Sequence, residues 1–147
     1  MNTLVTGGSG KLGCAVVADV VARGHDVVNV DLMPPSATQC PYLNIDLQDF
    51  GEVLEAIAGV DLCRPSDAVV HLAAIPGPGQ RSNARTFEHN MMSTYHVFEV
   101  CRRLGVHHVV YAWTEIIFGL PFATPPAYLP LDEEAPAEEA PARPESA

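Results

Sequence analysis

A glycine-rich stretch near the N-terminus is the first feature of this chain that could do chemistry. Gly7, Gly10 and Gly13 are spaced three residues apart, after the apolar pair Leu4 and Val5 and before a helical pattern. Glycines so placed allow a tight turn, a close approach of the backbone to a phosphate, and close packing of the helix on the strand. The N-terminus of the helix then offers free N–H groups to an anion. The stretch therefore predicts a pyrophosphate-binding turn.

Two alternatives to this interpretation differ in strength. An ordinary strand-to-helix turn can carry the same glycines, so it stays open on the motif alone. A nucleotide P-loop requires Gly, four residues, and then Gly-Lys-Ser/Thr. With Gly10 and Lys11 as the anchor, Val5 stands where the first Gly should be, and Leu12 replaces the hydroxyl residue that would hold magnesium. The P-loop is therefore excluded.

An acid at the end of the next apolar run strengthens the dinucleotide interpretation. Asp31 follows Gly13 by 18 residues. In a dinucleotide-binding fold this position meets the adenosine ribose, where a carboxylate accepts hydrogen bonds from both hydroxyls and repels a 2′-phosphate. Residues 32–38 contain no Lys or Arg. The pattern favours NAD over NADP, with an acid that merely ends a strand as the alternative.

Composition limits the class of protein. The chain has 147 residues, 48% apolar and 18% charged, which is typical of one globular domain. The net charge is −10, and residues 120–147 carry half of it. Because there is no basic patch, we expect neither nucleic acid nor an anionic membrane as a partner. Four scattered cysteines, no signal peptide and no apolar run of about 18 residues predict a cytoplasmic protein without a zinc site or a membrane span.

Alternating patterns predict five strands and three helices, hence a parallel sheet covered on both faces. The predicted strands span residues 2–6, 26–31, 42–46, 67–73 and 107–112, and the predicted helices span 11–23, 47–58 and 85–104. The fold class is α/β, a doubly wound, Rossmann-like sheet with strand order 3-2-1-4-5. We expect this domain to fill residues 1–119. The proline-rich residues 120–147 cannot propagate a helix and are predicted to be a long loop or tail.

Apolar residues at helical spacing predict which helix faces are buried. In the first helix the predicted face is Leu12, Val16 and Val20, with Val17 and Val21 flanking it; in the second it is Phe50, Leu54 and Ile57; in the third the stripe is Phe87, Met91, Thr94, Phe98 and Cys101.

Taken together, residues 2–119 resemble the extended short-chain dehydrogenases/reductases of the NAD-dependent epimerase/dehydratase type. The resemblance rests on an ordered set: Thr6-Gly7-x-x-Gly10-x-x-Gly13, Asp31, Asp46-Leu47, His71-Leu72-Ala73-Ala74, Asn90, and Val109-Val110-Tyr111-Ala112 leading to Phe118-Gly119. It implies that the cofactor is NAD. The cofactor-binding residues that it implies are Gly7, Gly10, Lys11, Leu12, Gly13, Asp31, Asp46, Leu47, Leu72, Ala73, Ala74 and Asn90.

The resemblance also implies individual roles. Asp46 and Leu47 match the pair that contacts the adenine ring, and Asp46 would meet its amino group; an N-cap of the following helix is the alternative for Asp46. Ala73 and Ala74 match small residues that let the backbone close on the cofactor ribose. His71 is expected to be a satisfied buried histidine and not a catalytic base.

Thr114 is the catalytic candidate that the resemblance implies, because the family places a hydroxyl here to donate a hydrogen bond to the substrate oxygen. Trp113 departs from the family, which usually has a second small hydroxyl residue. The family's 4,6-dehydratases have Thr-Asp-Glu, whereas this chain has Glu115 and Ile116 after Thr114. That difference argues against the dehydratase branch.

The family's general acid/base, a Tyr in Tyr-x-x-x-Lys, is missing from the sequence. The single Lys is Lys11, and no Tyr has a Lys four positions later. We therefore expect the cofactor-binding portion of an oxidoreductase for a sugar nucleotide or a similar carbinol or carbonyl substrate, inactive alone. A non-catalytic NAD sensor or regulatory module, and a truncated product without its own function, are the alternatives.

In the family the long helix commonly packs in a dimer interface, so a homodimer through residues 85–104 is expected.

Overall fold

The computed structural model describes residues 1–60, 64–77 and 79–114. The chain divides into two units, Met1–Tyr111 and Ala112–Ala147. The first unit contains all the helices and strands of the described residues, and residues 112–114 are the described part of the second.

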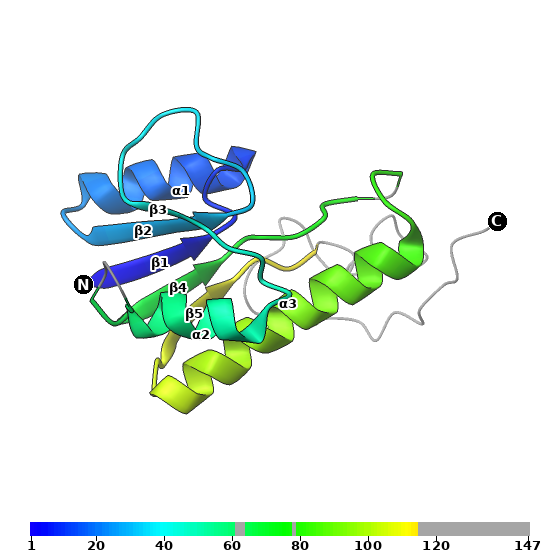
Figure 1. Ribbon diagram of the computed structural model, residues 1–147. Helices are drawn as coiled ribbons and strands as arrows, with labels where there is room; N and C mark the ends of the chain where they lie inside the picture. Colours follow the sequence, from blue (N-terminus) through cyan, green and yellow to red (C-terminus); the bar gives the residue numbers. More distant parts are fainter. Residues whose placement is uncertain (61–63, 78, 115–147) are drawn as a thin grey trace, which may run out of the picture. The chain divides into compact units, whose positions relative to one another are not determined.

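A parallel sheet of five strands forms the centre of the first unit (Figure 1). The order is β3-β2-β1-β4-β5, as predicted. Each strand pairs in parallel with its neighbours, so all carboxyl ends meet at one edge. The strands are β1 (Asn2–Thr6), β2 (Asp26–Asp31), β3 (Tyr42–Asn44), β4 (Ala68–His71) and β5 (His108–Tyr111).

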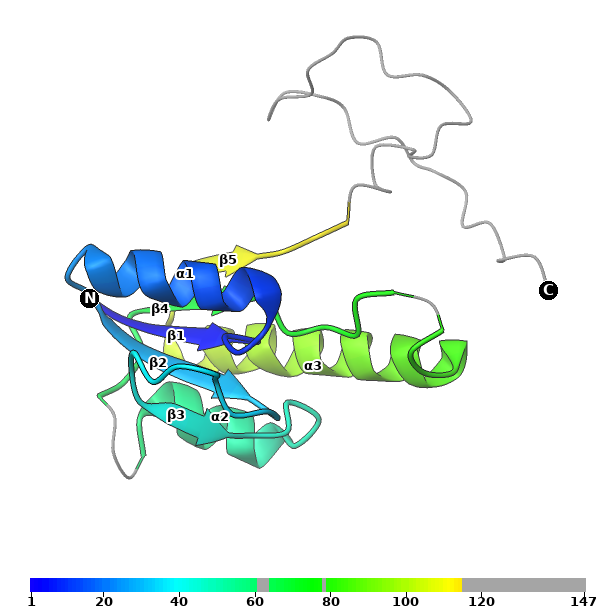
Figure 2. The same cartoon turned by 90° about the horizontal axis from the view of Figure 1, so that it is seen from above.

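Three helices cover the two faces of this sheet (Figure 2). Helix α1 (Lys11–Ala22) packs on one face, where Val5, Val17 and Val27 are buried together. Helices α2 (Phe50–Ala58) and α3 (Asn83–Leu104) pack on the other, around Leu4 and Val69. The valine-rich strands are apolar on both sides because helices cover both. The doubly wound fold that the alternating pattern predicts is confirmed.

The start of α2 corrects one prediction. The helix begins at Phe50 and not at residue 47, because Asp49 is its N-cap and its carboxylate accepts hydrogen bonds from the N–H groups of Gly51 (2.8 Å) and Glu52 (3.1 Å). The alternative role of Asp46 as the N-cap is therefore wrong. Its carboxylate instead accepts from the N–H of Gln48, at 2.9 Å, in the turn before the helix.

Two predicted buried faces also differ from the structure. Leu12 is 58% exposed, since Gly13 and Val17 are the α1 residues that turn toward the sheet. In α3 the predicted stripe is largely on the surface, and Phe87 is 69% exposed. The buried residues of α3 are Ser93, His96, Val97, Val100 and Cys101. No helix among the described residues is long and apolar enough to cross a membrane.

Candidate dinucleotide-binding site

A cavity of about 400 Å³ lies at the carboxyl edge of the sheet, where β1, β2 and β4 end. In open α/β sheets this edge is the usual place for a ligand. Seven of the predicted cofactor residues line the cavity: Gly7, Gly10, Asp31, Leu47, Leu72, Ala73 and Ala74. Five do not line it: Lys11, Leu12, Gly13, Asp46 and Asn90.

The glycine loop has a backbone that only glycine fits. Gly7 has a φ of +71°, and a Cβ there would lie 2.7 Å from the backbone nitrogen of Ala73. A Cβ on Gly13 would collide with the carbonyl oxygen of Gly7. The loop therefore lies directly against the chain that follows β4, and α1 lies directly on the loop.

The first turn of α1 leaves donors open. Gly10 is the N-cap, without a side-chain cap and without an acid in the first turn. The N–H groups of Lys11, Leu12 and Gly13 have no partner among the described residues. Unpaired N–H groups and the positive end of the helix dipole together suit an anion. These three residues can serve a pyrophosphate through their backbone although their side chains lie outside the cavity.

Asp31 joins the glycine loop to the end of β2. Its Oδ2 accepts from the N–H of Ser9 and its Oδ1 from the N–H of Met33, both at 3.0 Å. A carboxylate has about four acceptor positions. Two positions therefore remain for a ligand's hydroxyls, and the two backbone bonds already fix the orientation of the carboxylate.

The turn before α2 contains one unpaired donor. The N–H groups of Asp46, Gln48 and Asp49 are bonded to Glu52 Oε2, Asp46 Oδ1 and Asp46 O respectively. The N–H of Leu47 has no partner among the described residues, although Leu47 is 7% exposed and lines the cavity. A buried N–H is normally paired. This one is available to an acceptor on a ligand.

Hydrogen bonds to the hydroxyl oxygen of Thr6 hold the wall formed by Leu72 and Ala73. The N–H groups of these residues donate to Thr6 Oγ1 at 3.2 and 3.3 Å. Thr6 Oγ1 also lies within hydrogen-bond distance of Nδ1 of His71, at 2.7 Å, and Nε2 of His71 lies 3.2 Å from Thr94 Oγ1. Burial lowers the pKa of His71 to about 4. The prediction that His71 is a satisfied buried histidine is confirmed.

Asn90 fixes the next part of the same wall. Its Oδ1 accepts from the N–H of Ile75 at 2.8 Å, and its Nδ2 donates to the Ile75 carbonyl at 3.1 Å. Ile75 lines the cavity, whereas Asn90 does not. The geometry gives Asn90 a contact to the cavity wall, and direct contact with a cofactor stays a prediction.

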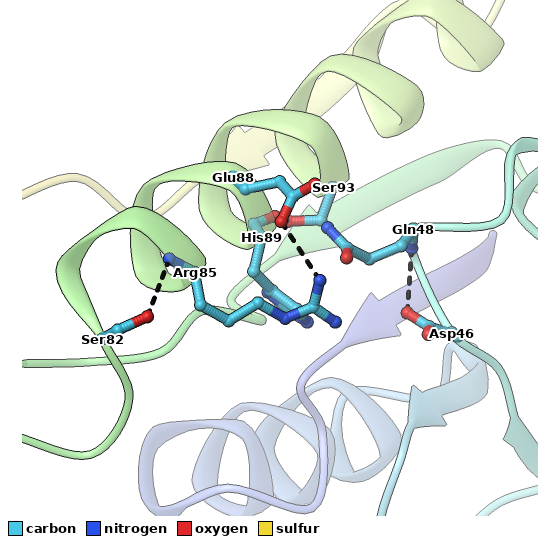
Figure 3. Close-up of polar contacts among 7 residues, drawn as sticks. All are labelled: Asp46, Gln48, Ser82, Arg85, Glu88, His89 and Ser93. Carbon is cyan, nitrogen blue, oxygen red and sulfur yellow. Dashed lines mark hydrogen bonds and ion pairs between the residues drawn. The ribbon is translucent and has the colours of Figure 1, made fainter.

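The cavity also includes residues that the motifs did not identify: Ser9, Met33, Ile45, Ile75, Pro76 and His89. Arg85 and His89 extend from α3 on the side where the Asp46–Gln48 turn lies (Figure 3). Nδ1 of His89 is buried without a partner among the described residues. Four of these residues are direct neighbours in sequence of a predicted one, namely of Gly10, Asp46, Ala74 and Asn90, and this adjacency could have identified them.

Thr114 lies in the second unit, so its relation to the cavity stays a prediction from the sequence. Glu115, Ile116, Phe118 and Gly119, which also entered the resemblance, lie outside the described residues.

The comparisons agree with this geometry. The model of the NAD dependent epimerase/dehydratase family matches residues 3–147, so the chain belongs to this family. The cofactor on which this family depends is NAD. The unpaired N–H groups at residues 11–13 and the close fit at Gly7 are what a bound pyrophosphate needs.

Individual relatives cover different activities. The chain is 29% identical over 122 residues to a 3-beta-hydroxysteroid dehydrogenase of Mycolicibacterium neoaurum, covering 80% of this chain and 33% of the relative. A short-chain dehydrogenase/reductase superfamily protein from Agrobacterium tumefaciens with bound NAD has a TM-score of 0.74 at 29% identity, covering 93% of this chain and 39% of that one. A UDP-glucose 4-epimerase from Thermus thermophilus in complex with NAD has a TM-score of 0.66 at 30% identity, covering 78% and 38%. The chain spans about a third of the length of the 3-beta-hydroxysteroid dehydrogenases that it matches.

Proposed function

We propose that this chain binds NAD in the cavity at the carboxyl edge of the sheet, as the cofactor-binding portion of an oxidoreductase. The observation that carries the proposal is the set of unpaired donors and acceptors around one cavity. Open N–H groups at the start of α1 suit the pyrophosphate, the carboxylate of Asp31 suits the adenosine ribose, and the Leu47 N–H suits the base.

The reaction class follows from the cofactor. Bound NAD accepts or returns a hydride at a carbinol or carbonyl carbon. Sugar nucleotides are the substrate class that we propose, supported by the UDP-glucose 4-epimerase among the relatives. The similarity to a steroid dehydrogenase supports other carbinols as the alternative substrate class. Thr114 is proposed to orient the substrate oxygen.

Turnover by these residues alone is not expected. A proton must leave the substrate hydroxyl as the hydride leaves carbon, and this requires a positioned base. The sequence has no Tyr followed four residues later by Lys, and His71 is bonded at both ring nitrogens. We propose that the chain binds NADH but oxidises no substrate at an enzymatic rate.

Cofactor selectivity tests the binding proposal. Fluorescence titration should show that NADH binds more tightly than NADPH, because the Asp31 carboxylate repels a 2′-phosphate. Asp31→Asn should reduce this preference by about tenfold, since the charge is removed while the side-chain size is kept. The ratio of the two dissociation constants is the informative quantity, because damage to the glycine loop weakens both ligands alike. Asp19→Asn, the same chemical change at an exposed carboxylate that does not line the cavity, is the control that should leave the ratio unchanged.

We also propose that the chain forms a homodimer through α3. Phe87, Met91, Tyr95 and Phe98 are between 42% and 69% exposed on this helix, and such apolar patches mark association sites. Sedimentation velocity should detect a dimer that Tyr95→Glu dissociates. A monomeric wild-type protein across micromolar concentrations would overturn this proposal.

A further inference from the structure

A second cavity, of about 380 Å³, lies at the amino edge of the sheet, opposite the edge of the proposed NAD site. Its lining comes from the starts of β1 and β2, the end of α1 and the segment that leads into β3. The polar side chains among the lining residues are those of Asn2, His25, Asp26, Gln39 and Arg64. None of the predicted cofactor residues lines this cavity. Its volume is within the range of small-molecule sites.

The backbone of Val27 is unpaired where β2 borders this cavity. Along β2, alternate residues bond to β1 and to β3, and Asn29 donates its N–H to the carbonyl of Pro41 at 2.9 Å. Val27, two residues earlier, therefore directs its N–H and C=O to the same side as Asn29. Pro41 has no N–H to donate to the Val27 carbonyl, and the Val27 N–H has no partner among the described residues. Because Val27 is only 4% exposed, a donor and an acceptor are left unpaired at a buried position.

Arg64 brings a positive charge to the same cavity. Asn2, which is 8% exposed, donates from Nδ2 to the carbonyl of Arg64 and to that of Pro65, so the backbone at Arg64 is tied to the start of β1. The guanidinium has no hydrogen bond or ion pair within the part of the chain that the structure describes. A free guanidinium can bind a carboxylate through two parallel N–H bonds. Asp26 also lines the cavity and carries the opposite charge.

We propose that this cavity is a second ligand site, for a secondary amide joined to a carboxylate: an N-acylated amino acid or the carboxyl-terminal residue of an extended peptide. The ligand's amide N–H donates to the Val27 carbonyl, and a carboxylate oxygen accepts from the Val27 N–H, as in a pair of antiparallel strand residues. The Arg64 guanidinium binds the same carboxylate. Asp26 opposes that negative charge, so the two side chains have effects of opposite sign. The site is independent of the proposed NAD binding.

NMR titration of the nitrogen-15-labelled protein with N-acetylglycylglycine tests the charged part of the site. The amide signal of Val27 should move downfield, because its N–H gains an acceptor. The terminal amide of the same compound lacks the charge and should bind about fivefold more weakly. Arg64→Gln should abolish this preference for the acid, and Asp26→Asn should enlarge it about twofold. Arg81→Gln, the same change at an exposed arginine that lines neither cavity, is the control and should leave the preference unchanged.

Pro41→Ala tests the backbone part of the site. It supplies an N–H to the Val27 carbonyl and should weaken binding of the acid and of the terminal amide alike, by about fivefold. Unchanged binding in this variant would overturn the proposal, as would an unmoved Val27 signal in wild type or an acid preference that survives Arg64→Gln.

Two further titrations identify the site and its ligand. Displacement of N-acetylglycylglycine by NADH would overturn the proposal, because the two compounds would then share the cavity at the carboxyl edge. A protein that binds N-acetylglycylglycine as expected but not NADH would refute only the proposed function. A longer peptide with the same end distinguishes the two sources of the ligand. Tighter binding of this peptide assigns the site to a chain terminus, and equal binding assigns it to a free acylated amino acid.

Discussion

The two faces of the sheet are covered in different ways. On the α2 and α3 face, eleven buried apolar residues form one cluster among the described residues, whereas three form the cluster under α1. On β5, Val110 is paired in register with Val70, which belongs to the α1 side of the sheet. Val110 is 62% exposed. The α2 and α3 face therefore contributes most of the apolar burial in the described residues.

The polar groups that shape the site also differ between the two faces. Side chains of α3 hold the cavity walls through Asn90 at Ile75 and His96 at Leu47, and Thr94 on the same helix contacts His71 at the end of β4. Helix α1 instead approaches the loop at Gly13, where no side chain intervenes, and leaves its first N–H groups unpaired. One face fixes the geometry of the site, and the other leaves donors open for the ligand.

Acid should destabilise the α3 face first, through His71. Burial lowers the pKa of His71 from 6.5 to about 4. The contribution of neutral, buried His71 to the free energy of unfolding is fully present above pH 6.5 and is lost as the pH falls toward 4. The total loss is roughly 3 kcal/mol.

Urea unfolding at steps between pH 7 and pH 4 measures this loss. His71→Gln should be less stable than wild type at pH 7 and should lose less stability across the window, because the group that titrates is gone. Parallel curves for the two proteins would show that His71 is not the group responsible.

A matched pair of substitutions compares the two faces directly. Val69 and Val5 are both fully buried valines on adjacent central strands, facing α3 and α1 respectively. Val69→Ala should cost about 2–3 kcal/mol of unfolding free energy, and Val5→Ala about 1 kcal/mol less, because a thinly covered site can collapse around the missing methyl groups. Urea unfolding at pH 7 gives both values. Equal costs would mean that α1 supports its face as firmly as the other two helices support theirs.

The strand order and the location of the site could be predicted from sequence because they depend on local signals. Valine runs separated by helical patterns, and glycines such as Gly7 and Gly13, fix where the chain must turn. The buried face of α3 could not be predicted in this way. Apolar spacing selected Phe87 and Met91, whereas the buried residues include Ser93 and His96.

Burial of those two polar residues depends on partners. Ser93 donates to the carbonyl of His89 at 2.7 Å, one turn away, and His96 bonds a carbonyl 49 residues distant. The second kind of partner does not appear in any local pattern. The same reason explains the start of α2: Asp46 and Asp49 are equally good caps by type, and the fold assigns the cap to Asp49.

The smallest effect is expected at Glu99 on α3, whose partners Arg102 and Arg103 are largely exposed. Hydrogen bonds from Arg102 and then Arg103 lower the pKa of Glu99 from 4.5 to about 2. The guanidinium nitrogens of Arg102 and Arg103 lie 2.7–2.9 Å from the carboxylate oxygens of Glu99. This contribution is present above pH 4.5 and is lost as the pH falls toward 2, below the window assigned to His71.

Glu99→Gln should therefore lower the melting temperature at pH 7 by less than either valine substitution. The difference should shrink as sodium chloride is raised, because exposed ion pairs are screened. Asp19→Asn, which removes an exposed ion pair with Arg23 on α1, is the matched change on the other helix. Glu99 has two guanidinium partners and Asp19 has one, so the α3 substitution should lower the melting temperature more. A larger effect on α1 would contradict the view that interactions at α3 carry more of the stability.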